Sequence, residues 1–142
     1  MSTNVVSVKD IKREWHLVDV KDQVLGRVAT GIARNLMGKN KPNFVPYLDN
    51  GDFVVVVNAD KVRVTGKKNE QKKYVRHSGY PGGLKVETFD KLISKSPEKI
   101  LEHAVWGMMP KNAMSKRILM KLKVYAGPNH PHSSQQPKTY TV

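Results

Sequence analysis

The sequence predicts a single α/β domain with a parallel sheet, and two observations lead to this prediction. An amphipathic helical pattern lies between two segments rich in strand-forming residues, which is the order of a βαβ unit. The second segment, residues 53–57, is apolar at every position, so both of its faces are predicted to be buried, as in an inner parallel strand. A chain of 142 residues, 39% of them hydrophobic, is long enough to bury the core of one domain.

Three strands are predicted in the first half of the chain, after an N-terminal arm of residues 1–14. The first strand covers residues 15–20, which are rich in β-formers and end at a polar turn. The second strand is residues 53–57. The third, at residues 61–65, alternates valine with basic or polar side chains, so we expect it to expose one basic face.

The helix between the first two strands is predicted at residues 26–37. Its apolar residues Val28, Ile32 and Leu36 recur every four positions, which places them on one face. Gly38 follows directly, and glycine is the residue that most often ends a helix in the left-handed conformation.

Residues 66–85 are predicted to form a long basic loop excursion, because they are rich in glycine and lysine and offer few core residues. Loops of this length inside a compact domain are usually functional or disordered. Two helices follow, one at residues 89–95 and one that begins with Ser96 as N-cap and Pro97 in the first turn. The buried face of the second helix is predicted to be Ile100, Leu101, Ala104, Val105 and Met108.

A short helix at residues 114–120 and a strand at residues 124–125 complete the predicted α/β domain, which spans residues 15–126. Residues 127–142 contain three prolines and no apolar periodicity. They are therefore predicted to be an extended C-terminal tail that packs on a neighbouring molecule or stays mobile.

The charge of the chain is strongly positive, with 25 Lys and Arg against 12 Asp and Glu, a formal net charge of +13. Residues 1–60 hold 8 basic and 7 acidic side chains, whereas residues 61–142 hold 17 and 5. A surface with charges of mainly one sign attracts polyanions, so the second part of the chain is predicted to face nucleic acid. No basic amphipathic helix with a bulky aromatic face is present, so a membrane partner is not expected.

Three groups of residues are the candidates for RNA binding. The first group is a basic stripe on the first helix and just beyond its end. The second group, residues 61–77, interleaves cations with Tyr and His. The third group, residues 111–123, carries five cations and no acid. Cations bind phosphate and aromatic rings stack on unpaired bases. The alternatives are a solvated helix face for the first group, a disordered loop for the second and an exposed basic helix for the third. The candidates are Arg27, Arg34, Lys39, Lys41, Lys61, Arg63, Lys67, Lys68, Lys72, Lys73, Tyr74, Arg76, His77, Lys111, Lys116, Arg117, Lys121 and Lys123.

Motifs for catalysis are poor in this sequence. Residues 65–68 are similar to the end of a phosphate-binding P-loop, but positions 61 and 68 are Lys where that motif needs Gly and Ser or Thr. His130 and His132 stand two apart in a chain without cysteine, so no metal site is expected. The sequence thus predicts no enzyme, no cofactor and no small-molecule substrate.

Two other functions stay open from the residues alone. A nucleic-acid-processing enzyme needs an acid–base pair or metal-binding carboxylates, and the acids of residues 61–142 are few and scattered. A turnover assay with magnesium would reveal such an enzyme. A DNA architectural protein would prefer DNA over RNA, and the sequence offers no recognition-helix motif or dimerisation heptad.

The order of several short motifs along the chain resembles the family of large-ribosomal-subunit protein thirteen, in its bacterial form. They include LGRVAT at 25–30, VTGKK at 64–68, GMMPK at 107–111 and LKVYAG at 122–127. The likeness extends over residues 9–137.

The resemblance implies a three-layer α/β/α domain with a small, mainly parallel sheet. It also implies binding to large-subunit ribosomal RNA early in assembly, contacts with neighbouring ribosomal proteins, a place in the cytoplasmic ribosome and no catalytic role. Trp106 stands where many relatives have a basic or aliphatic residue, so no phosphate contact is carried over to it; it is expected to pack or to stack on a base.

Overall fold

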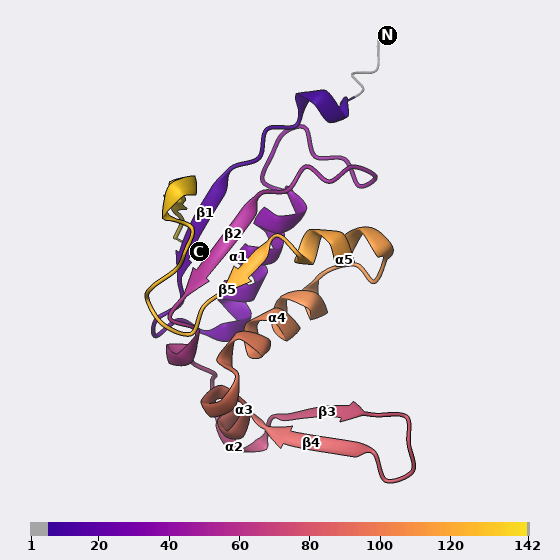
Figure 1. The fold of residues 1–142 in the computed structure, drawn as a ribbon, viewed down its shortest axis with the longest axis vertical. Helices are drawn as coiled ribbons and strands as arrows, with labels where there is room; N and C mark the ends of the chain where they lie inside the picture. Colours follow the sequence, from indigo (N-terminus) through magenta and orange to yellow (C-terminus); the bar gives the residue numbers. More distant parts are fainter. Residues whose placement is uncertain (1–5, 142) are drawn as a thin grey trace.

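The computed structural model describes residues 6–141 and shows a four-stranded parallel sheet with a separate antiparallel hairpin (Figure 1). The sheet order is β5-β2-β1-β6, and β3 pairs with β4. The strands are β1 (Trp15–Asp19), β2 (Phe53–Val57), β3 (Lys73–His77), β4 (Leu84–Thr88), β5 (Leu122–Val124) and β6 (Lys138–Thr139). The helices are α1 (Leu25–Met37), α2 (Lys68–Gln71), α3 (Phe89–Lys95), α4 (Pro97–Met108) and α5 (Ala113–Leu119), with 3-10 turns η1 (Val8–Asp10), η2 (Ala59–Lys61) and η3 (Ser133–Gln135). The predicted α/β class and mainly parallel sheet are confirmed.

The predicted βαβ unit consists of β1, α1 and β2. Helix α1 buries Val28, Ile32 and Leu36 against the sheet, as the four-residue spacing predicts. It ends at Gly38, whose φ of 77° is left-handed. A side chain at Gly38 would come within 2.9 Å of the backbone of Asn50, so glycine also fits the close approach of the two segments.

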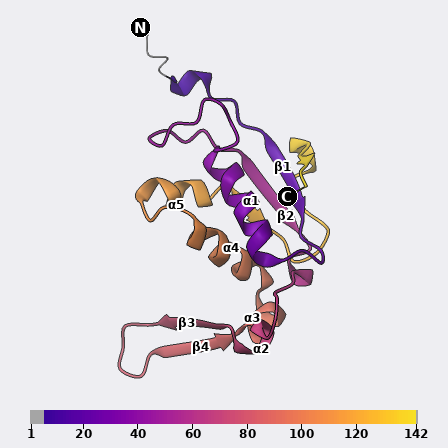
Figure 2. The same ribbon diagram turned by 180° about the vertical axis from the view of Figure 1, so that it is seen from behind.

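Strand β2 is buried on both faces, as predicted, but different elements pack against the two faces. Val54 and Val56 belong to the main core with α1, α4 and α5. Val55 is also fully buried, yet it lies outside that core cluster, on the opposite face. Helix α1 covers one face of the sheet in Figure 2, and the C-terminal segment crosses the other in Figure 1.

The third layer of the predicted α/β/α arrangement is therefore formed by the C-terminal segment and η3, and not by an α-helix. On this face Trp15 stacks on Phe53 with ring centroids 4.5 Å apart. His132 of the C-terminal segment packs on Trp15 at 5.2 Å. These rings supply the apolar cover that helices provide on the other face.

Residues 127–142 are predicted to pack on a neighbouring molecule or to stay mobile, but the structure packs them on their own sheet and forms β6. This strand pairs in parallel with β1, and the backbone N–H of Tyr140 donates to the carbonyl of Leu17 at 2.8 Å. The open edge of β1 offers unpaired backbone groups, and even two residues without apolar periodicity can satisfy them. Residues 1–5 of the predicted N-terminal arm lie outside the described residues.

The predicted loop excursion at residues 66–85 is also corrected. The segment forms α2 and most of a hairpin, which projects away from the sheet (Figures 1 and 2). Gly79 and Gly82, with φ of 87° and 71°, lie in the connection between β3 and β4. The sequence did not reveal the hairpin because its few apolar residues stand among many lysines and glycines. The third strand predicted at 61–65 is wrong, since this segment forms only an isolated bridge between Val24 and Arg63.

Helices α3, α4 and α5 lie where they are predicted, within one residue. In α4, Ile100, Leu101 and Val105 are buried and Ala104 is partly buried. Met108 is 42% exposed, because it ends the helix and the following Met109 occupies the core instead. Ser96 holds the N-cap position of α4, but its side chain makes no capping hydrogen bond. Within residues 6–141 no helix is long and apolar enough to cross a membrane.

Candidate RNA-binding surface

Most of the predicted RNA-binding side chains are exposed. The exposed members are Arg27, Arg34, Lys39, Lys61, Arg63, Lys67, Lys68, Lys72, Lys73, Arg76, His77, Lys111, Lys116 and Arg117. Lys41, Tyr74 and Lys123 are partly buried, and Lys121 is buried. Exposure leaves the cations of the first set open to an external anion.

Lys121 is an internal cation, which corrects its placement among the phosphate contacts. Its side chain is 8% exposed, and its Nζ donates to the Asp49 carboxylate and to the carbonyl of Gly51. Burial lowers the pKa of Lys121, and the hydrogen bond and charge of Asp49 oppose that shift. The sequence predicts repulsion between Lys121 and Arg117, four residues apart, if both lie on one helix. Helix α5 ends at Leu119, so Lys121 lies beyond it and has its own carboxylate.

Lys41 is only partly buried, but its ammonium also has internal partners. Its Nζ lies 2.6 Å from Asp52 Oδ1 and also donates to the backbone carbonyls of Lys12 and Asn50. Burial would raise the pKa of Asp52, but hydrogen bonds from Lys41, the Glu14 backbone and His16 outweigh it and hold that pKa below its ordinary value. This network connects the segment before β1 to the loop before β2, so Lys41 has a structural role in the free protein.

The remaining candidates form two neighbourhoods. A cavity bordered by Lys68 and Lys72 also includes Gly26 of α1 and His103 of α4. A second cavity brings Lys39 next to α5, the helix that carries Lys116 and Arg117. The first cavity thus places the cations of α2 beside the start of α1, and the second places Lys39 beside α5.

The hairpin has two chemically different faces. Residues alternate along β3, so Tyr74 and Arg76 share one face, and Val75 lies on the other opposite Val86. The face with Tyr74 and Arg76 turns toward α3 and α4, where both residues line a cavity.

The opposite face exposes three apolar side chains, which sequence reasoning missed. Val75 is 62% exposed, Leu84 60% and Val86 48%. The alternation of polar and apolar residues at 84–88 was the available signal for this strand. An exposed apolar strip of this kind marks an interaction surface more often than a plain loop does.

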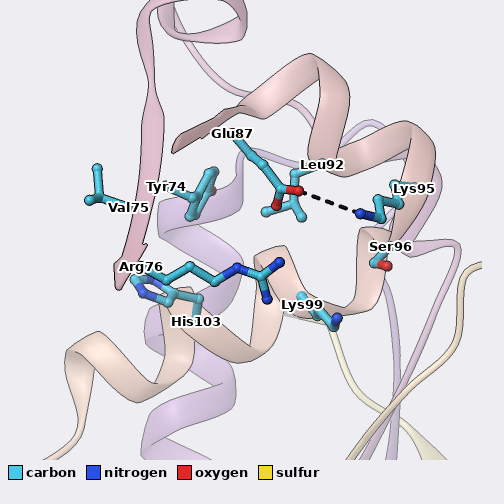
Figure 3. Close-up of a pocket in the computed structure, with 9 residues that line it drawn as sticks. All are labelled: Tyr74, Val75, Arg76, Glu87, Leu92, Lys95, Ser96, Lys99 and His103. Atoms are coloured by element: carbon cyan, nitrogen blue, oxygen red, sulfur yellow. Dashed lines mark hydrogen bonds and ion pairs between the residues drawn. The ribbon is translucent and has the colours of Figure 1, made fainter. Parts of the chain in front are cut away.

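A cavity of about 190 Å³ separates the hairpin from α3 and α4 (Figure 3). Its lining residues are Tyr74, Val75, Arg76, Glu87, Leu92, Lys95, Ser96, Lys99 and His103. The ring of His103 meets the ring of Tyr74 edge-on, with centroids 5.5 Å apart. Burial raises the pKa of Tyr74, and its hydroxyl has no hydrogen-bond partner.

Lys111 and Trp106 contact each other at the end of α4. The Lys111 ammonium lies 4.4 Å from the centre of the Trp106 ring and donates to the Trp106 carbonyl. Such a cation–π contact orients the lysine while its side chain stays exposed. Of the two roles expected for Trp106, the structure shows packing, here against a lysine.

The histidines of the C-terminal segment take part in packing. His132 Nε2 lies 2.7 Å from the Tyr125 hydroxyl, and the rings of His130 and His132 stack at 6.4 Å. Burial lowers the pKa of His132, and the nearby His130 and Lys123 lower it further. Among residues 6–141 no group of three His, Asp or Glu side chains is placed to hold a metal ion.

Comparison with known proteins shows to which family the chain belongs. The model of the family described as "Ribosomal protein L13" matches residues 13–131. The chain belongs to this family. Its members are ribosomal proteins and not enzymes, so the family and the non-enzymatic character predicted from the sequence are confirmed.

Relatives named "Large ribosomal subunit protein uL13" match almost the full length of the L13-family chain. The relative from Prochlorococcus marinus (strain MIT 9303) is 59% identical over 96% of this chain and 91% of its own length. The relative from Thermosynechococcus vestitus is 54% identical over 100% and 93%, and that from Roseiflexus castenholzii is 54% identical over 99% and 96%. These organisms are bacteria, in agreement with the bacterial form that the motifs indicate.

Proposed function

We propose that this L13-family protein is a structural constituent of the large ribosomal subunit in the cytoplasm, where it binds large-subunit ribosomal RNA. The observation that carries the proposal is the set of exposed cations at Lys67, Lys68, Lys72, Lys73 and Arg76. None of the five has a carboxylate within 4 Å in the described part of the chain. Five like charges within ten residues of α2 and β3 repel one another, and RNA phosphates relieve that repulsion.

The mechanism we propose has two steps. The field of residues 61–142 first speeds the encounter with RNA, because long-range attraction raises association rates. The sheet domain then acts as a rigid platform from which the hairpin and α5 bind separate RNA segments. Folded RNA is bound largely through its shape, its phosphates and its unpaired bases, which suits this set of side chains. Fixing RNA segments to one another in this way would support early assembly of the subunit.

Neighbouring ribosomal proteins are the second class of partner in the proposal. The exposed apolar strip of Val75, Leu84 and Val86 supports it, because a phosphate backbone gains little from an apolar surface. The apolar strip then packs against protein, while the exposed cations of α2 and the hairpin bind RNA.

The proposal is tested by co-sedimentation of the tagged protein with ribosomal particles in low and high salt. We expect the protein to remain with the large subunit through a high-salt wash. Release at moderate salt would mean that binding is non-specific attraction to phosphate, which weakens steeply as salt rises. That result, or absence from the particles, would contradict the proposal.

A further inference from the structure

We infer that the cavity between the hairpin and helices α3 and α4 binds one unpaired nucleotide of RNA. This inference rests on the proposed function and adds to it a specific site. The phosphate is held by Arg76 and Lys99, and the base lies against Tyr74, His103 and Leu92. The charge and the size of the cavity and the chemistry of its wall support this assignment (Figure 3).

The charge of the cavity favours an anion. Lys95 has a carboxylate partner, because its Nζ lies 3.5 Å from Glu87 Oε1. Arg76 and Lys99 have no carboxylate within 4 Å among the described residues. In Figure 3 the Arg76 side chain extends from β3 toward Lys99 of α4, and both residues line the cavity. Two cations that line one cavity with no carboxylate within 4 Å create a place where an anion removes their repulsion.

The size of the cavity limits the ligand. A volume of about 190 Å³ is below the roughly 300–1,000 Å³ of pockets that hold a drug-sized molecule. A single nucleotide of a longer strand needs only its base enclosed, since its sugar and phosphate stay at the open side. A duplex cannot insert one of its stacked bases, so the nucleotide has to be unpaired.

The side chains of the cavity wall favour a nucleotide over a carboxylate of a neighbouring protein. Tyr74 and His103 supply aromatic surface and Leu92, only 7% exposed, supplies an apolar floor. A base uses such surfaces for stacking, whereas a carboxylate does not. Lys72 lies 5.5 Å from the centre of the Tyr74 ring, so the cavity adjoins the exposed cations of the hairpin. An RNA strand bound along those cations therefore passes the cavity entrance.

The first test is an NMR titration of the full-length protein with a mixture of the four 5′-ribonucleoside monophosphates. Acetate and inorganic phosphate at equal ionic strength are the comparison probes. We expect the nucleotides to shift the Leu92 methyl and His103 ring signals, while acetate and phosphate leave the Leu92 methyl signals unchanged. Equal shifts with acetate, or no shift with nucleotides, would overturn the inference.

The second test compares two double variants with the same loss of charge in binding to deproteinised large-subunit ribosomal RNA. Arg76→Gln with Lys99→Gln removes the phosphate ligands, and Lys21→Gln with Lys91→Gln removes two exposed lysines outside the cavity. We expect the first pair to weaken binding by about tenfold or more and the second by less than about threefold. All four side chains are exposed, so both variants are expected to fold.

Different results of the RNA-binding test would contradict the nucleotide site and the proposed function. Equal weakening by the two double variants would overturn the nucleotide site while the wild-type protein still binds ribosomal RNA. Failure of the wild-type protein to bind that RNA would instead contradict the proposed function itself.

Discussion

The sheet domain and the hairpin use the same residue type in opposite ways. In the sheet domain, Lys41 and Lys121 are paired with Asp52 and Asp49 and help to hold the loop before β2 in place. In the segment formed by α2 and the hairpin, the cations from Lys67 to Arg76 are exposed and have no carboxylate within 4 Å among the described residues. The position of the acids, and not the number of lysines, therefore decides which cations stabilise the fold and which stay open to a partner.

The valines show the same contrast between the two regions. Val55 of β2 is fully buried, whereas Val75 of β3 is 62% exposed. Each lies in the middle of a five-residue strand. The sheet strand supports the core, and the hairpin strand presents side chains to the surroundings.

The largest expected effect is on folding, from a charge placed in each strand. Val55→Asp buries an unpaired carboxylate at a fully buried position of β2, so we expect a loss of more than about 4 kcal/mol in the free energy of unfolding. Val75→Asp puts the same charge in water and is expected to cost less than about 1 kcal/mol. Urea unfolding followed by circular dichroism measures both. A folded Val55→Asp variant would show that the inner-strand assignment is wrong.

The next effect is on RNA binding. Reversal of Lys67, Lys68, Lys72, Lys73 and Arg76 to Glu is expected to weaken binding to ribosomal RNA by about a thousandfold, since several phosphate contacts are lost together. The free energy of unfolding should change by less than about 1 kcal/mol, because all five side chains are exposed. Filter binding and thermal unfolding measure the two quantities.

The matched control for this reversal uses five exposed lysines outside the proposed RNA-binding set. These are Lys9, Lys12, Lys21, Lys91 and Lys138. If both sets weaken binding equally, net charge alone explains the affinity and the hairpin has no special part in it.

A third, smaller effect concerns the buried pair of Lys121 and Asp49. Asp49→Ala leaves a buried ammonium without its carboxylate and is expected to destabilise the fold by about 2–3 kcal/mol. Lys121→Met leaves only a partly exposed carboxylate and is expected to change stability by less than about 1 kcal/mol. Urea unfolding compares the two. A greater loss in Lys121→Met would mean that the ammonium supports the fold by more than its pairing with Asp49.

The sheet domain was predictable because its signals are local. The spacing of Val28, Ile32 and Leu36 fixes the buried face of α1, and the unbroken valines of β2 indicate cover on both sides. The hairpin has only the short alternation at residues 84–88 as a signal, since its strands bury little and their pairing depends on residues about ten positions apart. The short strand β6 was missed for a similar reason, because only its fit to the edge of β1 creates it.

The candidate site was predictable as a charge excess but not residue by residue. Sequence shows that Lys121 is basic, and only the fold shows that Asp49, far away along the chain, takes its charge. The cavity lined by Arg76, Lys99 and His103 could not be predicted from sequence either, because it lies between a strand and a helix that meet only after folding. Cation pairing and concave sites are properties of tertiary structure, so composition cannot assign them.

The smallest expected effect is a pH dependence that separates the two regions. The pKa of Asp52 is lower in the folded protein than the unfolded value of about 3.9. Its contribution to stability is therefore present above about pH 4 and is lost as pH falls through the lower folded pKa. Asp52→Asn removes this contribution. The difference in the free energy of unfolding between wild type and Asp52→Asn should be constant near neutral pH and shrink below about pH 4.

Glu70→Gln in α2 is the matched control for this titration. Glu70 is exposed and has no ion-pair partner among the described residues, so its removal should leave the free energy of unfolding nearly unchanged at each pH. Urea unfolding at several values between pH 7 and pH 3 measures both variants. If Glu70→Gln shows the same pH-dependent difference as Asp52→Asn, the loss of stability in acid depends on the overall charge and not on Asp52. If only Asp52→Asn shows it, the acid sensitivity of the sheet domain comes from its internal carboxylate Asp52 and not from an exposed acid such as Glu70.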